Sequence, residues 1–302
     1  MNPGPEQVIC IDWGTTNFRA YLVDTLSGNC LSECHSEQGL LALKPSQFAD
    51  YCQAQVGHWR VKADTPIYLS GMVGSDKGWA TAPQLEVPVS SQSLARELLA
   101  APGMENAWIV PGAKIVSEHH VDVMRGEEVQ TLGAMALYSG STKVCCLPGT
   151  HSKWVSVDSH SISHFSTSIS GELYSLLLQH SLLGRPAQAD AAFNESAFRL
   201  GVHRSLDEGL LHALFEARSR FLYAGLTAAE IPGFISGVVI GEEVGRMSKV
   251  YPKLNTLLLV CSKALFQPYT IALRMVDIQA TWIDSQAATL AGILAIHRLR
   301  LS

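Results

Sequence analysis

The chain has 302 residues, of which 47% are hydrophobic and 16% are charged, and its net charge is −5. This length allows one large or two medium domains, and the hydrophobic content indicates a globular fold with a substantial core. The sequence has no basic block, no apolar run of transmembrane length and no signal-peptide pattern, so we expect neither nucleic acid nor membrane partners. The low charged fraction indicates extensive burial, which leaves a homodimer interface open.

Seven cysteines are spread along the chain, and none of them form a CxxC pair. An odd number of cysteines, mostly within apolar runs, is typical of reduced thiols in a cytoplasmic protein. We therefore expect all seven to be buried packing residues.

Near the N-terminus a polar turn, residues 12–17, separates two apolar runs at residues 8–11 and 18–23. Two apolar runs around a short turn predict a strand, a tight turn and a second strand. Asp12, at the end of the first strand, is suited to hold a hydrated Mg²⁺, and Gly14 lets the backbone come close to a ligand. We call residues 8–24 the first hairpin.

Two threonines, Thr15 and Thr16, add hydroxyl and N–H donors for phosphate oxygens to this turn. The turn is not a P-loop, because no Gly-Lys-Ser/Thr follows and no helix begins after it. An ordinary Asp-Gly hairpin turn is the alternative. The combination of an Asp, a Gly and two Thr in one turn favours a phosphate-binding hairpin.

The segment that follows the first hairpin predicts a mixture of helices and strands. Apolar periodicity and punctuating residues indicate these elements. The helices are expected at residues 45–59, 93–99 and 127–138, and the strands at residues 66–69 and 108–110.

A second strand-turn-strand pattern, the second hairpin, occurs at residues 143–157, with Gly149-Thr150-His151-Ser152-Lys153 in its turn. Two Gly-Thr hairpins about half a chain apart indicate two related domains that clamp one polyphosphate from opposite sides. We expect the N-terminal domain, with the first phosphate hairpin, to span residues 1–138. The C-terminal domain, with the nucleotide site, is expected to span residues 139–302.

The second half of the chain is richer in predicted helices than the first. Alternation of strands and helices in both halves predicts α/β or mixed α+β domains. Helices are expected at residues 171–183, 209–218, 232–247, 264–273 and 285–298, and strands at residues 257–260 and 274–278.

Five segments with long, specific motifs occur in order along the chain, at residues 12–19, 71–75, 122–128, 147–154 and 236–243. Together they resemble the 2-dehydro-3-deoxygalactonokinase family, and the resemblance covers nearly the whole chain. It implies two ribonuclease-H-like (actin-like ATPase) domains with ATP and Mg²⁺ in an interdomain cleft. It also implies ATP-dependent phosphorylation of 2-dehydro-3-deoxy-D-galactonate on its terminal (C6) hydroxyl, in galactonate catabolism.

In related sugar kinases the base that orients the attacking hydroxyl is a carboxylate at the start of a helix, just before the second phosphate hairpin. Three carboxylates lie in the corresponding segment, and Glu127 is our first choice, followed by Asp122 and then Glu128. The alternative for each is structural, because a carboxylate near a helix N-terminus is stabilised by the helix dipole.

The second hairpin and a later helix are expected to bind the nucleotide. Gly149 and Thr150 would meet the phosphates, His151 would contact phosphate or substrate, and Lys153 would be either a counter-charge or a solvated strand residue. Ser236-Gly237 would allow a flat base to approach, or would pack one helix on another, and Glu242 or Glu243 would accept ribose hydroxyls. Strand 257–260 runs into Cys261-Ser262 without the glycine that is usual at the adenosine site of the superfamily. Either the base lies differently from its usual position, or Ser262 takes the place of the glycine.

The sugar acid requires a cation or a set of N–H donors for its carboxylate. The candidates lie directly after the first hairpin turn and in the glycine-bounded loop 71–75 with its surroundings. They are Asn17, Arg19, Gly71, Met72, Ser75 and Trp79.

Two other functions remain open from the sequence. The same hairpins suit a kinase for another small sugar or sugar acid. They also suit a nucleotide-binding regulator of the superfamily that phosphorylates no metabolite.

Overall fold

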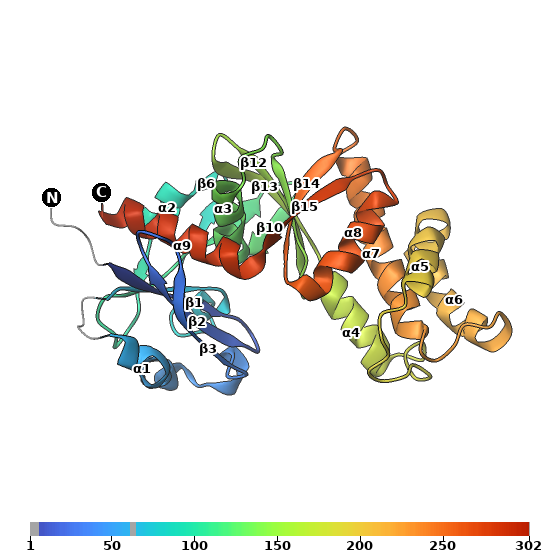
Figure 1. Ribbon diagram of the computed structural model, residues 1–302, viewed down its shortest axis with the longest axis horizontal. Helices are drawn as coiled ribbons and strands as arrows, with labels where there is room; N and C mark the ends of the chain where they lie inside the picture. Colours follow the sequence, from blue (N-terminus) through green and yellow to red (C-terminus); the bar gives the residue numbers. More distant parts are fainter. Residues whose placement is uncertain (1–5, 61–64, 302) are drawn as a thin grey trace. The chain divides into compact units, whose positions relative to one another are not determined.

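The computed structural model describes residues 6–60 and 65–301 (Figure 1). Its contacts divide the chain into two compact units. Unit 1 consists of Met1–Ser141, Val155–Phe165 and Asp284–Ser302, and unit 2 of Thr142–Trp154 and Ser166–Ile283. The expected boundary after residue 138 lies three residues before the first change of unit, and the segments 155–165 and 284–302 group with unit 1.

The main sheet of unit 1 has the strand order β3-β2-β1-β4-β8-β7. Strand β1 (Gln7–Trp13) pairs antiparallel with β2 (Phe18–Asp24), as the first hairpin predicted, and parallel with β4 (Ile67–Ser70). The parallel register sets Asp12 opposite Ser70, so the carboxyl ends of β1 and β4 meet at the same edge of the sheet. The other strands are β3 (Cys30–Ser36), β8 (Ala107–Ile109) and β7 (Leu99–Ala100).

A smaller sheet and four α-helices complete most of unit 1. The sheet has the order β10-β9-β5, with β5 at Gln84–Glu86, β9 at Gly112–Val116 and β10 at Val121–Met124. The helices are α1 (Phe48–Val56), α2 (Ser91–Arg96), α3 (Glu127–Leu137) and α9 (Ser285–Leu301), with 3₁₀ turns at Leu40–Ala42, Pro45–Gln47, Gly57–Trp59 and Met72–Gly74. Helices α3 and α9 pack so closely that a Cβ at Gly133 would overlap the Ala288 carbonyl (Figure 1).

A third sheet has the order β15-β14-β11-β12-β13-β6, and β11 pairs parallel with β14. The chain changes unit within three of its strands, β12, β13 and, at its last residue, β15. The strands are β6 (Val89–Ser90), β11 (Val144–Leu147), β12 (Ser152–Asp158), β13 (Ser161–Ser168), β14 (Thr256–Cys261) and β15 (Gln279–Asp284).

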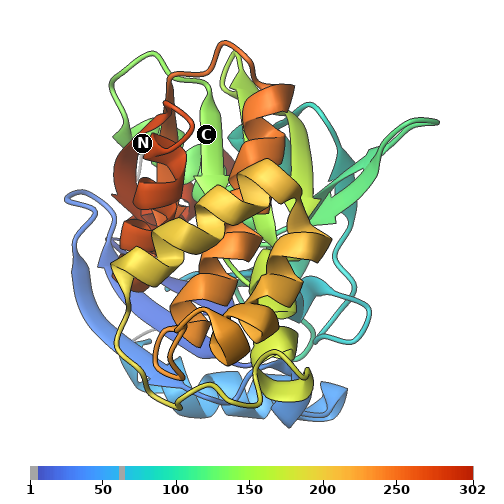
Figure 2. The same ribbon diagram turned by 90° about the vertical axis from the view of Figure 1, so that its right-hand side faces the viewer.

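Unit 2 carries five helices, of which the long α7 is buried along most of its length. Figure 2 faces these helices, with α5, α6 and α7 packed together in yellow and orange. Helix α8 contains Pro268 in its interior. The helices are α4 (Ser170–His180), α5 (Glu195–Glu208), α6 (Leu210–Tyr223), α7 (Ile231–Val250) and α8 (Lys263–Arg274).

Most predicted elements are present, but some expectations are wrong. The strand expected at residues 274–278 is the end of α8 and a turn, and β15 begins only at Gln279. The helix expected at residues 45–59 is a short α1 between two 3₁₀ turns. Helix α5 was not predicted, because its buried face includes the small residues Ala197, Gly201 and Ser205 and gives a weak apolar pattern.

All seven cysteines are free thiols, but their burial differs from expectation. Cys30 is exposed and Cys34 is half-buried, so the prediction of uniform burial is wrong for these two residues of strand β3. Across residues 6–60 and 65–301, no helix combines the length and the apolar character needed to cross a membrane.

Candidate active site

The turn of the first hairpin packs on one side against residues 39–41, where a Cβ at Gly39 would overlap the Thr16 nitrogen. The carbonyls of Gly14 and Thr15 accept hydrogen bonds from the N–H groups of Leu40 (3.0 Å) and Leu41 (3.2 Å). In a trans peptide the N–H points away from the carbonyl, so the N–H groups of Thr15 and Thr16 point away from residues 40–41. Both threonines are exposed. The turn therefore offers two adjacent N–H donors, which suits an anion such as phosphate.

Asp12 ends strand β1 beside this turn, with its side chain 23% exposed. Its Oδ2 lies 3.3 Å from Nη1 of Arg19, the residue opposite it on β2. Burial raises the pKa of the Asp12 carboxyl, the Arg19 guanidinium lowers it, and the charge of Glu127 raises it again; the net shift is upward. The structure thus brings Asp12, Arg19 and Glu127 into one electrostatic cluster.

The first turn of α3 supplies two acidic residues with different surroundings. Both carboxylate oxygens of Glu128 accept the N–H of Gly126, at 2.8 and 2.9 Å, and the side chain is fully buried. Burial, followed by the charge of Glu127, raises the pKa of Glu128 to about 8. Glu127 is half-buried, and its Oε2 accepts the N–H of Arg125 at 3.1 Å. Glu127 is therefore the more accessible of the two acids.

Two glycines allow this helix start to approach Asp12. Gly71 has φ +93°, and a Cβ there would lie 2.9 Å from the Trp13 carbonyl oxygen and 3.3 Å from Oδ1 of Asp12. A Cβ at Gly126 would lie 3.2 Å from the Cα of Gly71. A side chain at either position would push apart the end of β1, the 71–75 loop and the start of α3.

Asp122, our second choice for the base, lies in other surroundings. It sits on β10 opposite Ile115, accepts the N–H of Val123 at 2.7 Å and lies 3.9 Å from Nε2 of His120. These contacts tie Asp122 to its own strand and to a histidine, whereas Glu127 stands at the helix start that approaches Asp12 through Gly71 and Gly126. The geometry therefore favours Glu127.

One expected substrate contact in the 71–79 segment is corrected by its burial. Trp79 is 7% exposed, donates its Nε1–H to the Pro102 carbonyl at 3.1 Å and packs on Trp13, so it is a core residue. The Ser75 hydroxyl is enclosed and has no hydrogen-bond partner in the described part of the chain, so its role as a substrate contact stays a prediction. Met72 is half-buried against the same core.

Asn17 and Arg19 remain at the surface beside Asp12. Asn17 donates from Nδ2 to the Thr16 hydroxyl at 2.9 Å, and the Arg19 side chain is 48% exposed. Of the six predicted sugar-acid contacts, these two have accessible polar side chains next to the carboxylate cluster.

In unit 2 the turn of the second hairpin is exposed and is supported by the start of α4. The N–H of Glu172 donates to the Thr150 carbonyl at 3.0 Å, and His151 Nε2 lies 2.6 Å from the Glu172 carboxylate. A Cβ at Gly171 would overlap the Gly149 carbonyl, so the helix start packs directly on the turn. A Cβ at Gly149 itself would meet nothing within 4 Å, so a ligand can approach its backbone.

Lys153 follows this turn on β12 and is only 3% exposed. Its Nζ donates to the His151 carbonyl at 3.3 Å. The alternative of a solvated strand residue is therefore wrong. The Lys153 side chain is therefore packed against the backbone of the turn.

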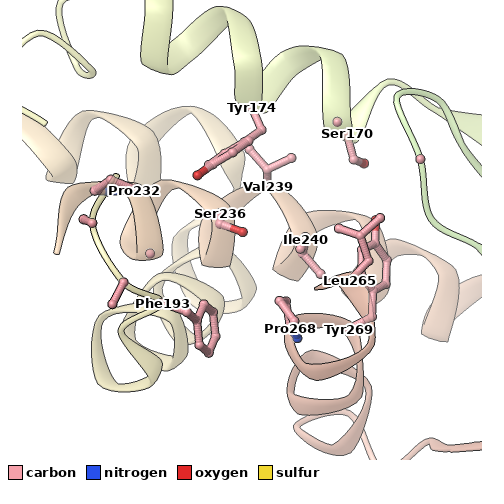
Figure 3. Close-up of a pocket in the computed structure, with 15 residues that line it drawn as sticks. Ser170, Tyr174, Phe193, Pro232, Ser236, Val239, Ile240, Leu265, Pro268 and Tyr269 are labelled. Atoms are coloured by element: carbon pink, nitrogen blue, oxygen red, sulfur yellow. The ribbon is translucent and has the colours of Figure 1, made fainter. Parts of the chain in front are cut away.

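A cavity of about 270 Å³ opens beside the second hairpin, within unit 2 (Figure 3). Its walls come from α4, the loop before α5, α7 and α8, and Gly149 forms part of its edge. Most of the lining is apolar or aromatic, as is usual for a small-molecule site. Lining residues drawn in Figure 3 include Tyr174, Phe193, Pro232, Ser236, Pro268 and Tyr269.

Ser236 and Gly237, which were both predicted to bind the nucleotide, have different surroundings in the structure. Ser236 lines the cavity, but a Cβ at Gly237 would overlap the Phe198 carbonyl on α5. Gly237 therefore serves helix packing, and its assignment to nucleotide binding is corrected. Glu243 is 4% exposed and accepts hydrogen bonds from protein donors only, within the residues that are described, so the expectation that it binds ribose hydroxyls is also wrong.

Sequence reasoning missed most of the cavity lining, including the aromatic residues Tyr174, Phe193 and Tyr269. These residues stand on three separate segments, and each reads as an ordinary packing residue in its own segment. The Cys261-Ser262 segment, which lacks the glycine usual at the adenosine site, leads into helix α8. Ser262 is the N-cap of this helix, which begins at Lys263, and Leu265 in its first turn lines the cavity.

Comparisons with known proteins decide the family. The family model described as 2-keto-3-deoxy-galactonokinase matches residues 12–296. The 2-dehydro-3-deoxygalactonokinase of Escherichia coli K12 is 37% identical over 291 residues, which cover 95% of this chain and 96% of that protein. The chain belongs to the 2-keto-3-deoxy-galactonokinase family. The resemblance drawn from the sequence motifs is therefore confirmed.

Solved structures support the family and its fold. A crystal structure from Sinorhizobium meliloti matches with TM-score 0.89 and 31% identity, covering 96% of this chain and 98% of that chain. A ligand-bound xylulose kinase from Lactobacillus acidophilus matches with TM-score 0.53 and 10% identity, covering 97% of this chain and 89% of that chain. The second likeness extends to the fold alone, and it confirms the α/β, ribonuclease-H-like architecture of the actin-like ATPases.

Proposed function

We propose that this member of the 2-keto-3-deoxy-galactonokinase family transfers the γ-phosphoryl group of ATP to 2-dehydro-3-deoxy-D-galactonate. The acceptor would be the terminal (C6) hydroxyl, as a step of galactonate catabolism. The observation that carries the proposal is the close approach of the start of α3, which bears Glu127, to the end of β1, which bears Asp12. Gly71 and Gly126 allow this approach, and the neighbouring turn carries two exposed threonines that suit a phosphate. A carboxylate pair beside an anion site is what phosphoryl transfer to an alcohol requires.

The nucleotide is proposed to bind in unit 2. The base and ribose would occupy the cavity between α4, α7 and α8, whose lining is largely apolar. The phosphates would lie on the second hairpin, because Gly149 is shared by the cavity edge and the turn and has open space above its backbone. Thr150, His151 and Lys153 would add donors and positive charge there.

Glu127 is proposed to be the general base. As the C6 oxygen attacks the γ-phosphorus, the bond from that phosphorus to the ADP oxygen breaks, and the hydroxyl proton passes to Glu127. Glu128 would not take this role, because its carboxylate is fully buried on the Gly126 N–H. Its contact would instead fix the turn from which Glu127 projects.

Magnesium is proposed to accompany ATP. No group of three or more His, Cys, Asp and Glu residues suited to a metal occurs among residues 6–60 and 65–301. The residues therefore do not form an all-protein metal cage, but they fit Mg²⁺, which typically takes one or two carboxylates together with phosphate oxygens and waters. Asp12 would be the carboxylate, and the ion would neutralise phosphate charge.

The carboxylate of the sugar acid is proposed to meet Arg19. This guanidinium is half exposed, and one of its Nη atoms already holds Asp12 at 3.3 Å, which fixes its orientation. A planar guanidinium has further donors that match a second carboxylate. Asn17, beside it in the turn, would contact a substrate oxygen.

The free thiols at all seven cysteines support a cytoplasmic location.

A coupled assay for ADP release with ATP and 2-dehydro-3-deoxygalactonate tests the proposal. Wild-type enzyme should prefer this acid over neutral sugars, and Glu127→Gln should lower kcat by about 10²–10⁴-fold while ATP still binds. Asp122→Asn is the matched control, with the same loss of one carboxylate charge, and should keep turnover near the wild-type rate. No ADP release by folded wild-type protein, or preference for a neutral sugar, would overturn the proposed reaction.

A further inference from the structure

Glu243, on α7, lies at the centre of a buried hydrogen-bond cluster in unit 2. Its Oε1 accepts from the Ser152 hydroxyl at 2.6 Å and from the Trp154 indole N–H at 2.8 Å. Its Oε2 accepts from the Tyr269 hydroxyl at 2.9 Å and from the Ser170 hydroxyl. Four donors from three other elements thus converge on one carboxylate that is 4% exposed.

These donors belong to the parts of unit 2 that we assign to the nucleotide. Ser152 directly follows His151, so it anchors the end of the second hairpin turn. Ser170 begins α4, the helix whose first residues support the same turn, and it also lines the cavity. Tyr269, on α8, lines the cavity from another wall, and Figure 3 labels it together with Ser170. Glu243 therefore connects the turn to two cavity walls.

We propose that Glu243 is a positioning residue that fixes the second hairpin relative to the cavity. This inference rests on the nucleotide site proposed above. A buried carboxylate holds its donors firmly, because each buried hydroxyl or N–H that loses it would remain unsatisfied. Helix α7 is a rigid support for it, since α5 packs on the Gly237 backbone. Glu243 thus determines how phosphates on the turn align with a base in the cavity.

Another buried acid of unit 2 provides the matched control. Glu216, on α6, is 8% exposed and accepts hydrogen bonds from Arg204 and Arg220. Neither Glu216 nor these two arginines line the cavity. The same Glu→Gln change at the two positions therefore removes one buried carboxylate each. Of the two acids, only Glu243 is hydrogen-bonded to residues that line the cavity, Ser170 and Tyr269.

The test compares ATP binding to Glu243→Gln, Glu216→Gln and the wild type by isothermal titration calorimetry, with thermal unfolding measured in parallel. Gln keeps the shape of the side chain but replaces one acceptor oxygen by an NH₂ group. We expect Glu243→Gln to raise the Kd of ATP about tenfold, equivalent to ~1.4 kcal/mol. It should raise KM for ATP and leave KM for the sugar acid unchanged. Glu216→Gln should lower the unfolding temperature without changing the Kd of ATP.

Two single-donor variants keep the test valid if Glu243→Gln fails to fold. Ser152→Ala removes the donor at the turn and Tyr269→Phe removes a donor at the cavity wall. Each should weaken ATP binding on its own. Where Glu243→Gln does fold, a double-mutant cycle adds a second test: each effect should shrink in the Glu243→Gln background, because the shared acceptor is already altered.

The outcomes separate this inference from the proposed function. If wild-type protein binds ATP but Glu243→Gln, Ser152→Ala and Tyr269→Phe bind it equally well, the positioning role is overturned and the nucleotide site stands. The same conclusion follows if Glu216→Gln weakens ATP binding as much as Glu243→Gln does. If the wild type binds no ATP, the proposed nucleotide site and the inference both fail.

Discussion

Replacing Glu128 by Gln is expected to make the stability of the protein less sensitive to rising pH. The Glu128 carboxyl is fully buried, and its pKa of about 8 lies well above the ordinary value of 4.5. The folded state therefore retains a proton that the unfolded state releases between these two values. The stabilisation is complete below the ordinary pKa, and stability falls as the pH rises towards the folded-state pKa.

The size of this effect follows from the two pKa values. With 4.5 in the unfolded state and about 8 in the folded state, the free energy of unfolding falls by about 3 kcal/mol between about pH 5 and about pH 7.5. Gln is neutral at every pH and can still accept the Gly126 N–H through its carbonyl oxygen. The variant should therefore lose this contribution to the pH slope while it keeps the turn at the start of α3.

Urea unfolding at a series of pH values measures both slopes. Glu216→Gln is the control, because burial raises the pKa of Glu216 but hydrogen bonds and charge from Arg204 and Arg220 outweigh it and lower the pKa overall. Its contribution to stability is lost only as the pH falls through acidic values, so this control should keep the wild-type slope from about pH 5 to about pH 7.5. Parallel slopes for the wild type and Glu128→Gln would refute the reasoning.

Two further substitutions test close backbone approaches. Gly237→Ala should lower the free energy of unfolding by about 1–3 kcal/mol in chemical denaturation, because the added Cβ would overlap the Phe198 carbonyl between α5 and α7; unchanged stability would contradict this packing. Gly171→Ala should raise the Kd of ATP in calorimetry, because its Cβ would overlap the Gly149 carbonyl and displace the second hairpin. Equal ATP affinity in that variant would show that the turn tolerates displacement.

Both hairpins could be predicted from the sequence because their functional groups are neighbours along the chain. Strand β1, the turn and strand β2 are continuous, so residue type and order were sufficient to place Asp12 at a strand end. The cavity could not be predicted, since its walls come from α4, α7, α8 and a loop that only tertiary packing brings together. Glu243 shows the same limit, because its four donors are 26 to 91 positions away along the chain.

The choice of the base among the three acids at residues 122–128 could be predicted in part from the sequence. Position 128 shares a helix face with Leu132, four residues later, buried and apolar. Position 127 shares a face with Thr131, which is also buried but polar. The apolar partner favours burial of Glu128, but the helical period alone does not separate the two acids. What the period does not indicate is the partner of Glu127, because Asp12 reaches it only through the close approach of Gly71 and Gly126.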